Sequence, residues 1–244
     1  VGNLIDWLGV FPDEFDGYDE LGKISSLYIT PDDIHIQNVV ILPPIKNAAD
    51  RDLIKSALIK YGAVAVSHCA NFDTSKYFNK SSSAQYCYDT KDSTHRVCIV
   101  GWDDNYSRYN FLKTPEGDGA WIIKNSWGTQ WGDEGYFYLS YYDPSLADKE
   151  SVCYIIDNDQ YTRIYQHDVD GDSKWLPESK YYASVFTADD DEIIVAVGTI
   201  FNESGREYEF TVSVNDVEVH TQKGTSKFGG YETIKLDKYV PVKK

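Results

Sequence analysis

The most regular hydrophobic pattern in the chain lies between residues 47 and 62. Apolar side chains recur there every three or four residues, at Leu53, Ile54, Ala57, Leu58 and Tyr61. This spacing predicts a helix over residues 50–61 that buries one face. Asn47 is suited to cap its first turn, and Gly62 is suited to the left-handed conformation that often follows a helix.

Short runs of β-branched and aromatic residues around this helix predict strands, because each run is bounded by Gly, Pro or polar residues. The expected strands cover residues 34–42, 63–66, 97–100, 120–124 and 136–142, with polar or Gly-rich loops over 103–119 and 128–135. A short helix is also expected over residues 4–11.

The pattern changes after about residue 160. The strand-like segments there are short and separated by turns, and they cover residues 181–187, 193–201, 208–214 and 233–236. This pattern predicts a second, all-β domain of the sandwich type. Because about eighty residues are fewer than the roughly 100 of a complete sandwich, we expect a partial domain. The expected division is residues 1–160 and residues 161–244.

Composition excludes several classes of protein. The 244 residues include 23 Lys and Arg against 39 Asp and Glu, which gives a formal net charge of −16. Such a charge opposes binding to nucleic acid and to anionic lipid. With 42% hydrophobic and 15% aromatic residues the chain is not an acidic disordered one, and no apolar run approaches the ~20 residues of a membrane span.

No metal or cofactor is expected. Asp168, Asp170 and Asp172 alternate as oxygen ligands do in some calcium loops, but Gly171 follows the second acid and not the third. A solvated acidic turn is the favoured interpretation. The histidines other than His95 are scattered, and no two of them have the spacing of a zinc site.

The strongest chemical signal comes from two segments thirty residues apart. His95 begins the run His-Arg-Val-Cys-Ile-Val-Gly-Trp, and Asn125 lies in Lys-Asn-Ser-Trp-Gly-Thr-Gln-Trp-Gly-Asp-Glu-Gly. Together they resemble the papain-like cysteine peptidases. The resemblance implies that His95 keeps a cysteine deprotonated and then protonates the leaving amine. It also implies that Asn125 orients the His95 ring and that Trp127 shields their hydrogen bond from water.

The resemblance extends over residues 34–143 and implies an α+β fold, of which this chain contains mostly the β-sheet half. The helix and the following Gly62-Ala-Val-Ala-Val look like the family's segment before its central sheet, which implies that Val66 and Ser67 border the substrate pocket; ordinary strand core is the alternative. Beyond residue 160 a weaker match is similar to a prokaryotic branch, in which a lectin-like β-domain follows the peptidase domain.

The family's nucleophile has no counterpart in this sequence. None of the cysteines lies in a Cys-Gly-Ser-Cys-Trp type motif, and no Gln precedes one at the distance that the family's oxyanion hole requires. The sequence also opens at Val1 and contains no Met. We therefore expect the segment that bears the nucleophile to be absent, and this chain to be inactive by itself.

The family also suggests a disulfide. Many members join a Cys shortly before the His to one about 25 residues after the Asn, and Cys87 and Cys153 lie at offsets of eight and twenty-eight. The resemblance thus implies a Cys87–Cys153 bridge and an oxidising, extracytoplasmic setting. Cys69 and Cys98 are expected to be buried free thiols. Arg96 departs from the family, which has a small residue after the His, so it either faces solvent or marks a relaxed site.

Two functions remain open at this stage. The first is a cysteine endopeptidase, secreted or on the cell surface, that cleaves peptides or proteins with His95 and Asn125 in its site. The second is a non-catalytic adhesion protein that retains the peptidase fold and binds a glycan or a cell-wall component through its β-domain. A Cys-x-x-Cys-Trp type motif preceded by Gln, upstream of residue 1, would favour the enzyme.

Overall fold

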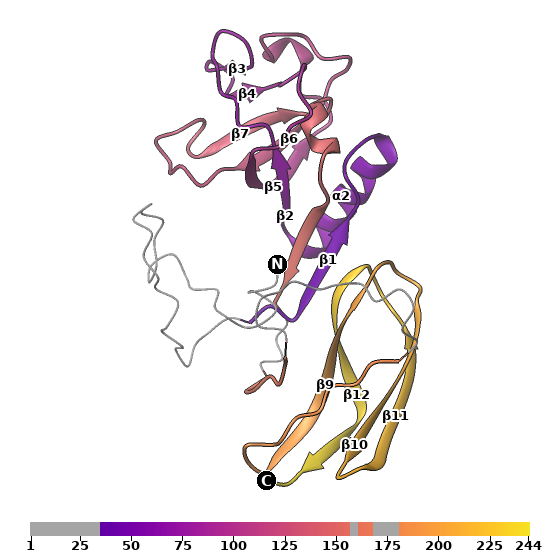
Figure 1. Ribbon diagram of the computed structural model, residues 1–244. Coiled ribbons are helices and arrows are strands. Elements are labelled where there is room, and N and C mark those ends of the chain that lie inside the picture. Colours follow the sequence, from indigo (N-terminus) through magenta and orange to yellow (C-terminus); the bar gives the residue numbers. More distant parts are fainter. Residues whose placement is uncertain (1–34, 157–160, 168–180) are drawn as a thin grey trace. The chain divides into compact units, whose positions relative to one another are not determined.

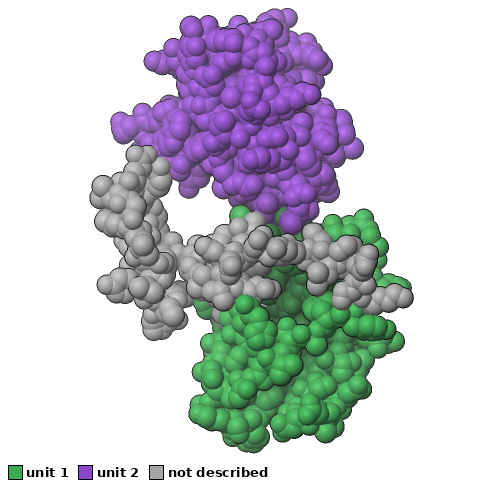
Figure 2. All heavy atoms as spheres, in the orientation of Figure 1, with its two compact units in different colours: residues 1–40, 154–244 green, residues 41–153 purple. Residues whose placement is uncertain are grey.

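The computed structural model describes residues 35–156, 161–167 and 181–244 (Figure 1). The chain divides into two compact units, one of residues 41–153 and one of residues 1–40 with 154–244 (Figure 2). The expected helix over residues 4–11 and the acidic turn at Asp168–Asp172 lie outside the described residues. Within the described residues, no helix is both long and apolar enough to cross a membrane.

A mostly antiparallel sheet forms the core of the unit of residues 41–153. Its order is β3-β4-β7-β6-β5-β2-β8, and only β4 and β7 run parallel. The strands are β2 (Val64–His68), β3 (Phe78–Asn79), β4 (Ala84–Gln85), β5 (His95–Asp103), β6 (Ala120–Lys124), β7 (Tyr136–Ser140) and β8 (Ser151–Ile155). Trp121 and Ile123 of β6 and Phe137 of β7 are completely buried, so the sheet contributes side chains to the hydrophobic core.

The helix α2 (Ala48–Tyr61) packs against β2 and β5. Asn47 and Asp50 form a capping box in which each side chain accepts a hydrogen bond from the other's backbone N–H, both at 3.2 Å. Gly62 ends the helix with a φ of 89°, and its N–H donates to the Leu58 carbonyl at 2.9 Å. The predicted helix is confirmed, although Leu53 is 42% exposed and not part of the buried face.

The strands predicted before residue 160 are also present, with shifted ends. β1 (Asn38–Leu42) lies inside the predicted 34–42, and the predicted 97–100 is the centre of the nine-residue β5. Two short 3-10 helices, η1 (Arg108–Asn110) and η2 (Pro144–Ala147), were not predicted. β3 and β4 were also missed, because two-residue strands leave no periodic pattern.

The other unit contains two antiparallel strand pairs. β9 (Glu192–Phe201) pairs with β12 (Gly230–Val242), and Val39 and Val40 of β1 also pair with β12. β10 (Glu207–Val214) and β11 (Val217–Thr225) form a hairpin. Asn215 and Asp216 make its two-residue turn with φ of 50° and 61°, as the tight turns of hairpins require.

The strand predicted over residues 181–187 is wrong. This segment has no strand pairing, and Tyr181, Tyr182 and Val185 are 89%, 77% and 83% exposed. Tyr182 instead reaches Thr199 of β9 through its hydroxyl at 2.5 Å. The apolar residues of this segment do not alternate with polar ones, so the segment is hydrophobic but has no apolar face of the kind that a half-buried strand needs.

The strand β11 was not predicted, because most of its residues are polar or charged.

Candidate active site

His95 and Asn125 meet at the ends of neighbouring strands. His95 is the first residue of β5, and Asn125 directly follows β6, which runs antiparallel to β5. The His95 Nε2 atom lies 2.9 Å from the Asn125 Oδ1 atom. Two residues thirty positions apart in the sequence are therefore joined by a hydrogen bond of ideal length.

The surroundings of Asn125 fix the direction of this hydrogen bond. The Ser126 N–H donates to the same Oδ1 atom at 2.9 Å, and an N–H can be satisfied only by the amide oxygen. Because an amide oxygen only accepts, His95 must donate through Nε2. In the neutral ring this leaves Nδ1 with the lone pair, available to take a proton from a reacting group.

The backbone holds Asn125 in place. Its N–H donates to the Gly135 carbonyl at 3.0 Å, and the residue is only 7% exposed. Gly128, Gly132 and Gly135 give the intervening loop its positive φ angles of 78°, 63° and 92°. At Gly132 a Cβ atom would lie 2.4 Å from the Tyr136 carbonyl oxygen. No residue other than glycine therefore fits at position 132 without a backbone shift.

Trp127 lies against the ring of His95. Its ring stacks on that of His95 with centroids 5.4 Å apart and an interplanar angle of 28°. Phe72 and Trp131 pack edge to face against Trp127, each with a centroid distance of 5.1 Å. Trp127 remains 40% exposed, and its role as a shield of the hydrogen bond stays a prediction.

His68 lies behind His95, and the sequence analysis did not assign it a role. It pairs with His95 across β2 and β5, and the two ring centroids are 5.8 Å apart. Burial, followed by the nearby charge of His95, lowers the pKa of His68 to about 3, so its ring is neutral at physiological pH. Neither ring nitrogen of His68 has a well-formed hydrogen bond within the described residues.

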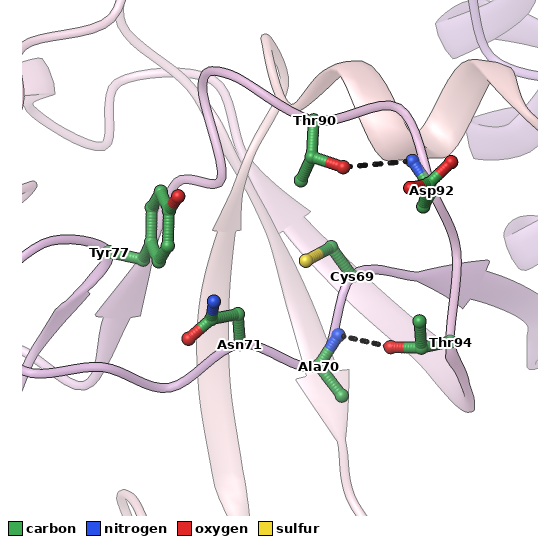
Figure 3. A pocket seen from close by; sticks show the side chains of 7 residues that line it. All are labelled: Cys69, Ala70, Asn71, Tyr77, Thr90, Asp92 and Thr94. Atoms are coloured by element: carbon green, nitrogen blue, oxygen red, sulfur yellow. Dashed lines mark hydrogen bonds between the residues drawn. The ribbon is translucent and has the colours of Figure 1, made fainter.

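A pocket of about 400 Å³ opens beside the end of β2 (Figure 3). Its lining residues come from the segments after β2 and before β5, and they are Cys69, Ala70, Asn71, Tyr77, Thr90, Asp92 and Thr94. Val66 is buried in the core at 2% exposure, and Ser67 is half-buried opposite Arg96. Neither Val66 nor Ser67 lines this pocket, and their role in a substrate pocket stays a prediction.

The structure corrects the expected pairing of cysteines. All four are free thiols, so the Cys87–Cys153 bridge is not formed. The Cys87 Sγ atom lies near the Cys69 carbonyl, just beyond the C-terminal end of β2. Cys153 follows Val152, which pairs with Ala65 near the other end of the same strand. The two expected partners therefore neighbour opposite ends of β2.

The exposure of Cys69, Cys98 and Arg96 can be compared with what the sequence predicts. Cys69 is buried, as expected, whereas Cys98 is only half-buried. Arg96 is exposed on β5 opposite Ser67. Because this side of the strand faces solvent, a large side chain after His95 creates no steric conflict, and Arg96 gives no indication of a relaxed site.

Comparison with known proteins identifies the family. Residues 35–160, more than half of the chain, match the family described as "Papain family cysteine protease". The chain belongs to this family. Residues 164–244 match a second family, described as "Lectin like domain". The predicted resemblance and the predicted α+β fold class are confirmed.

Named relatives agree with this assignment. Pro-cathepsin H of Mus musculus is 33% identical over 129 residues, which cover 52% of this chain and 34% of the relative. A cathepsin L-like peptidase of Aedes aegypti is 30% identical over 91 residues, which cover 37% and 24%. The chain thus spans about a quarter to a third of the length of these curated relatives.

Solved structures extend the likeness to both parts of the chain. The clostridial cysteine protease Cwp84 after propeptide cleavage is 27% identical with a TM-score of 0.77, and the match covers 100% of this chain and 63% of that chain. A structure of the cysteine protease and lectin-like domains of Cwp84, described as a surface layer associated protein of Clostridium difficile, is 23% identical with a TM-score of 0.65. That match covers 99% of this chain and 56% of that chain.

Proposed function

We propose that this chain provides the histidine and asparagine of a cysteine endopeptidase that hydrolyses peptide bonds in protein substrates. The observation that carries the proposal is the hydrogen bond from His95 Nε2 to Asn125 Oδ1 under the ring of Trp127. It leaves His95 Nδ1 free to pair with a cysteine thiol, to hold that thiol as thiolate and to protonate the leaving amine.

The nucleophile of this proposal is a cysteine outside the 244 residues. Burial raises the pKa of Cys87, Cys98 and Cys153, the last to about 11, which opposes the thiolate that the reaction needs. The buried Cys69 packs against Tyr77 and Cys87, and none of its described contacts joins it to His95. The partial coverage of the relatives is consistent with a further segment of protein that supplies the cysteine.

The test uses the full-length protein, including the sequence that precedes residue 1. We expect it to react stoichiometrically with an epoxide inhibitor of cysteine proteases, whereas the 244-residue chain does not react. His95→Ala and Asn125→Ala should abolish or sharply lower peptide hydrolysis. His167→Ala and Asn105→Ala serve as matched controls, because both side chains are exposed and outside the site. Unchanged hydrolysis in either site variant would remove that residue from the site.

We further propose that residues 161–244 bind a glycan or cell-wall component, and that the protein acts outside the cell or on its surface. The lectin-like match and the exposed rings of Tyr181 and Tyr182 support carbohydrate binding. Sedimentation of the chain with purified cell-wall polysaccharide tests this. If the full-length protein binds the polysaccharide and never reacts with the epoxide, the non-catalytic adhesion function replaces the peptidase.

A further inference from the structure

Cys69, which lines the pocket in Figure 3, belongs to one buried cluster with Cys87. Cys69 follows β2 and Cys87 follows β4, and the Cys87 Sγ atom lies 3.6 Å from the Cys69 carbonyl oxygen. Tyr77 packs in the same buried cluster as the two cysteines. Gln85 holds them together, because its Nε2 atom donates to the Cys69 carbonyl at 2.9 Å and approaches the Cys87 Sγ atom at 3.4 Å.

Buried hydrogen bonds anchor the backbone on both sides of this pair. The Cys87 N–H donates to Asp143 Oδ2 at 2.8 Å, and the Cys69 N–H donates to Ser145 Oγ at 2.9 Å. The Ser145 hydroxyl in turn donates to Asp143 Oδ1 at 2.5 Å. Both cysteines are thus attached to one buried network, which restricts the movement of the two residues relative to each other.

The two thiols differ in access. Cys69 lines the pocket, and Figure 3 shows its sulfur directed into it. Cys87 does not line the pocket and is completely buried. Burial, with the nearby Asp143 carboxyl, raises the pKa of the Cys87 thiol. A reagent in the pocket can therefore contact Cys69, whereas Cys87 is not accessible from the pocket.

We propose that Cys69 and Cys87 form a disulfide by exchange with a low-molecular-weight disulfide that enters the pocket. The deprotonated Cys69 thiol attacks one sulfur of the small disulfide, which forms a mixed disulfide and releases one small thiolate. That thiolate takes the proton of Cys87 while the Cys87 sulfur attacks Cys69 Sγ, so that no free Cys87 thiolate has to form. The attack breaks the mixed disulfide and releases the second small thiolate, which takes up from solvent the proton that Cys69 gave up. Two protein thiols are oxidised, and one small disulfide is reduced to two thiols.

The bridge closes the segment of residues 69–87, which contains Phe72. The Phe72 ring packs on Trp127, Trp131 and His68 with centroid distances of 5.1, 4.9 and 5.9 Å. Oxidation therefore tethers the segment that supports the ring over His95. The proposed exchange is independent of the peptidase function, because it uses no group of the His95–Asn125 pair.

The experiment treats the reduced full chain with glutathione disulfide, blocks the remaining thiols with a maleimide under denaturing conditions, and maps tryptic peptides by mass spectrometry. We expect the peptides of Cys69 and Cys87 to be joined, and the joined product to be lost in Cys69→Ser and Cys87→Ser. Cys98→Ser and Cys153→Ser are matched controls that should retain it. Maleimide on both Cys69 and Cys87, or a Cys87–Cys153 link, would overturn the proposal.

The single variants also test the order of attack. Cys87→Ser should accumulate glutathione on Cys69, because no second thiol resolves the mixed disulfide. Cys69→Ser should accumulate none on Cys87, because that thiol has no access to the pocket. Circular dichroism checks that both variants fold. Glutathione on Cys87 and none on Cys69 would contradict the proposed path, whatever the outcome of the peptidase assays.

Discussion

The rings of His68 and His95 meet edge to face across β2 and β5, with centroids 5.8 Å apart and an interplanar angle of 60°. One histidine faces the proposed site, and the other is buried among apolar rings, including that of Phe137 at 5.4 Å. A buried histidine is stable only when neutral. The unit of residues 41–153 therefore carries a titratable group directly behind its proposed general acid.

The first prediction concerns stability at low pH. Burial lowers the pKa of His68 from its usual 6.5 to about 3, so the unfolded chain binds this proton more tightly than the folded one. The contribution of neutral His68 to the free energy of unfolding is therefore complete above pH 6.5, and it is lost as the pH falls toward 3. At pH 4 this linkage costs roughly 3 kcal/mol of the free energy of unfolding.

Urea unfolding at pH 7 and pH 4 measures this effect. His68→Leu should lose less stability between the two pH values than the wild type, since leucine has no proton to bind. His167→Leu, which alters an exposed histidine, should keep the dependence of the wild type. Equal losses in His68→Leu and the wild type would show that other groups control the acid transition.

The second prediction concerns the acceptor atom at Asn125. In the full-length protein, Asn125→Ala should lower kcat/KM by roughly 100-fold, because the His95 ring loses the oxygen that fixes its orientation. Asn125→Asp should retain more activity than Asn125→Ala, since a carboxylate still accepts from Nε2. Kinetics on a peptide substrate, with circular dichroism as a check on folding, compare the two. Equal activities would contradict the orienting role.

The third prediction concerns the shield over this hydrogen bond. Trp127→Ala removes the ring stacked on His95, so water should reach the Nε2 proton and exchange it faster. In proton NMR spectra the His95 Nε2–H resonance should broaden or disappear in Trp127→Ala and remain in Trp127→Phe. Trp102→Phe changes an indole outside the site and is the control. A sharp resonance in Trp127→Ala would mean that other groups protect the bond.

Local sequence patterns were sufficient to predict α2 and to identify His95 and Asn125 as a pair. The capping box at Asn47 and Asp50 and the closing Gly62 lie within one helix, so no distant contact is needed to recognise them. His95 and Asn125 were found through the family motif, and their contact follows from two adjacent strands that lie close in sequence.

Features that depend on distant pairing could not be predicted. The role of His68 arises only from the register of β2 with β5, which the alternation of Val64, Val66 and His68 does not specify. The contact of Cys69 with Cys87 likewise depends on how the segment after β2 returns beside β4. The exposed segment 181–187 shows the opposite case, because apolar residues without a period do not specify a strand.

The final prediction compares two glycines in the loop between Asn125 and β7. Gly128 and Gly132 both have positive φ, at 78° and 63°, but a Cβ atom at Gly128 would meet nothing within 4 Å. Gly128→Ala should therefore lower the free energy of unfolding by only about 1–2 kcal/mol, which is the cost of placing alanine in a left-handed backbone conformation. Gly132→Ala should cost about 1–3 kcal/mol more, because its Cβ would lie 2.4 Å from the Tyr136 carbonyl oxygen and force the backbone to move.

Urea unfolding of the two alanine variants at pH 7 gives this difference directly. The loop returns through Gly135, whose carbonyl accepts from the Asn125 N–H at 3.0 Å. A backbone shift at Gly132 should therefore also displace Asn125 and change the His95 Nε2–H resonance, whereas Gly128→Ala should leave that resonance in place. If both variants lose the same stability and keep the same resonance, the steric conflict at Gly132 does not control the geometry of the site.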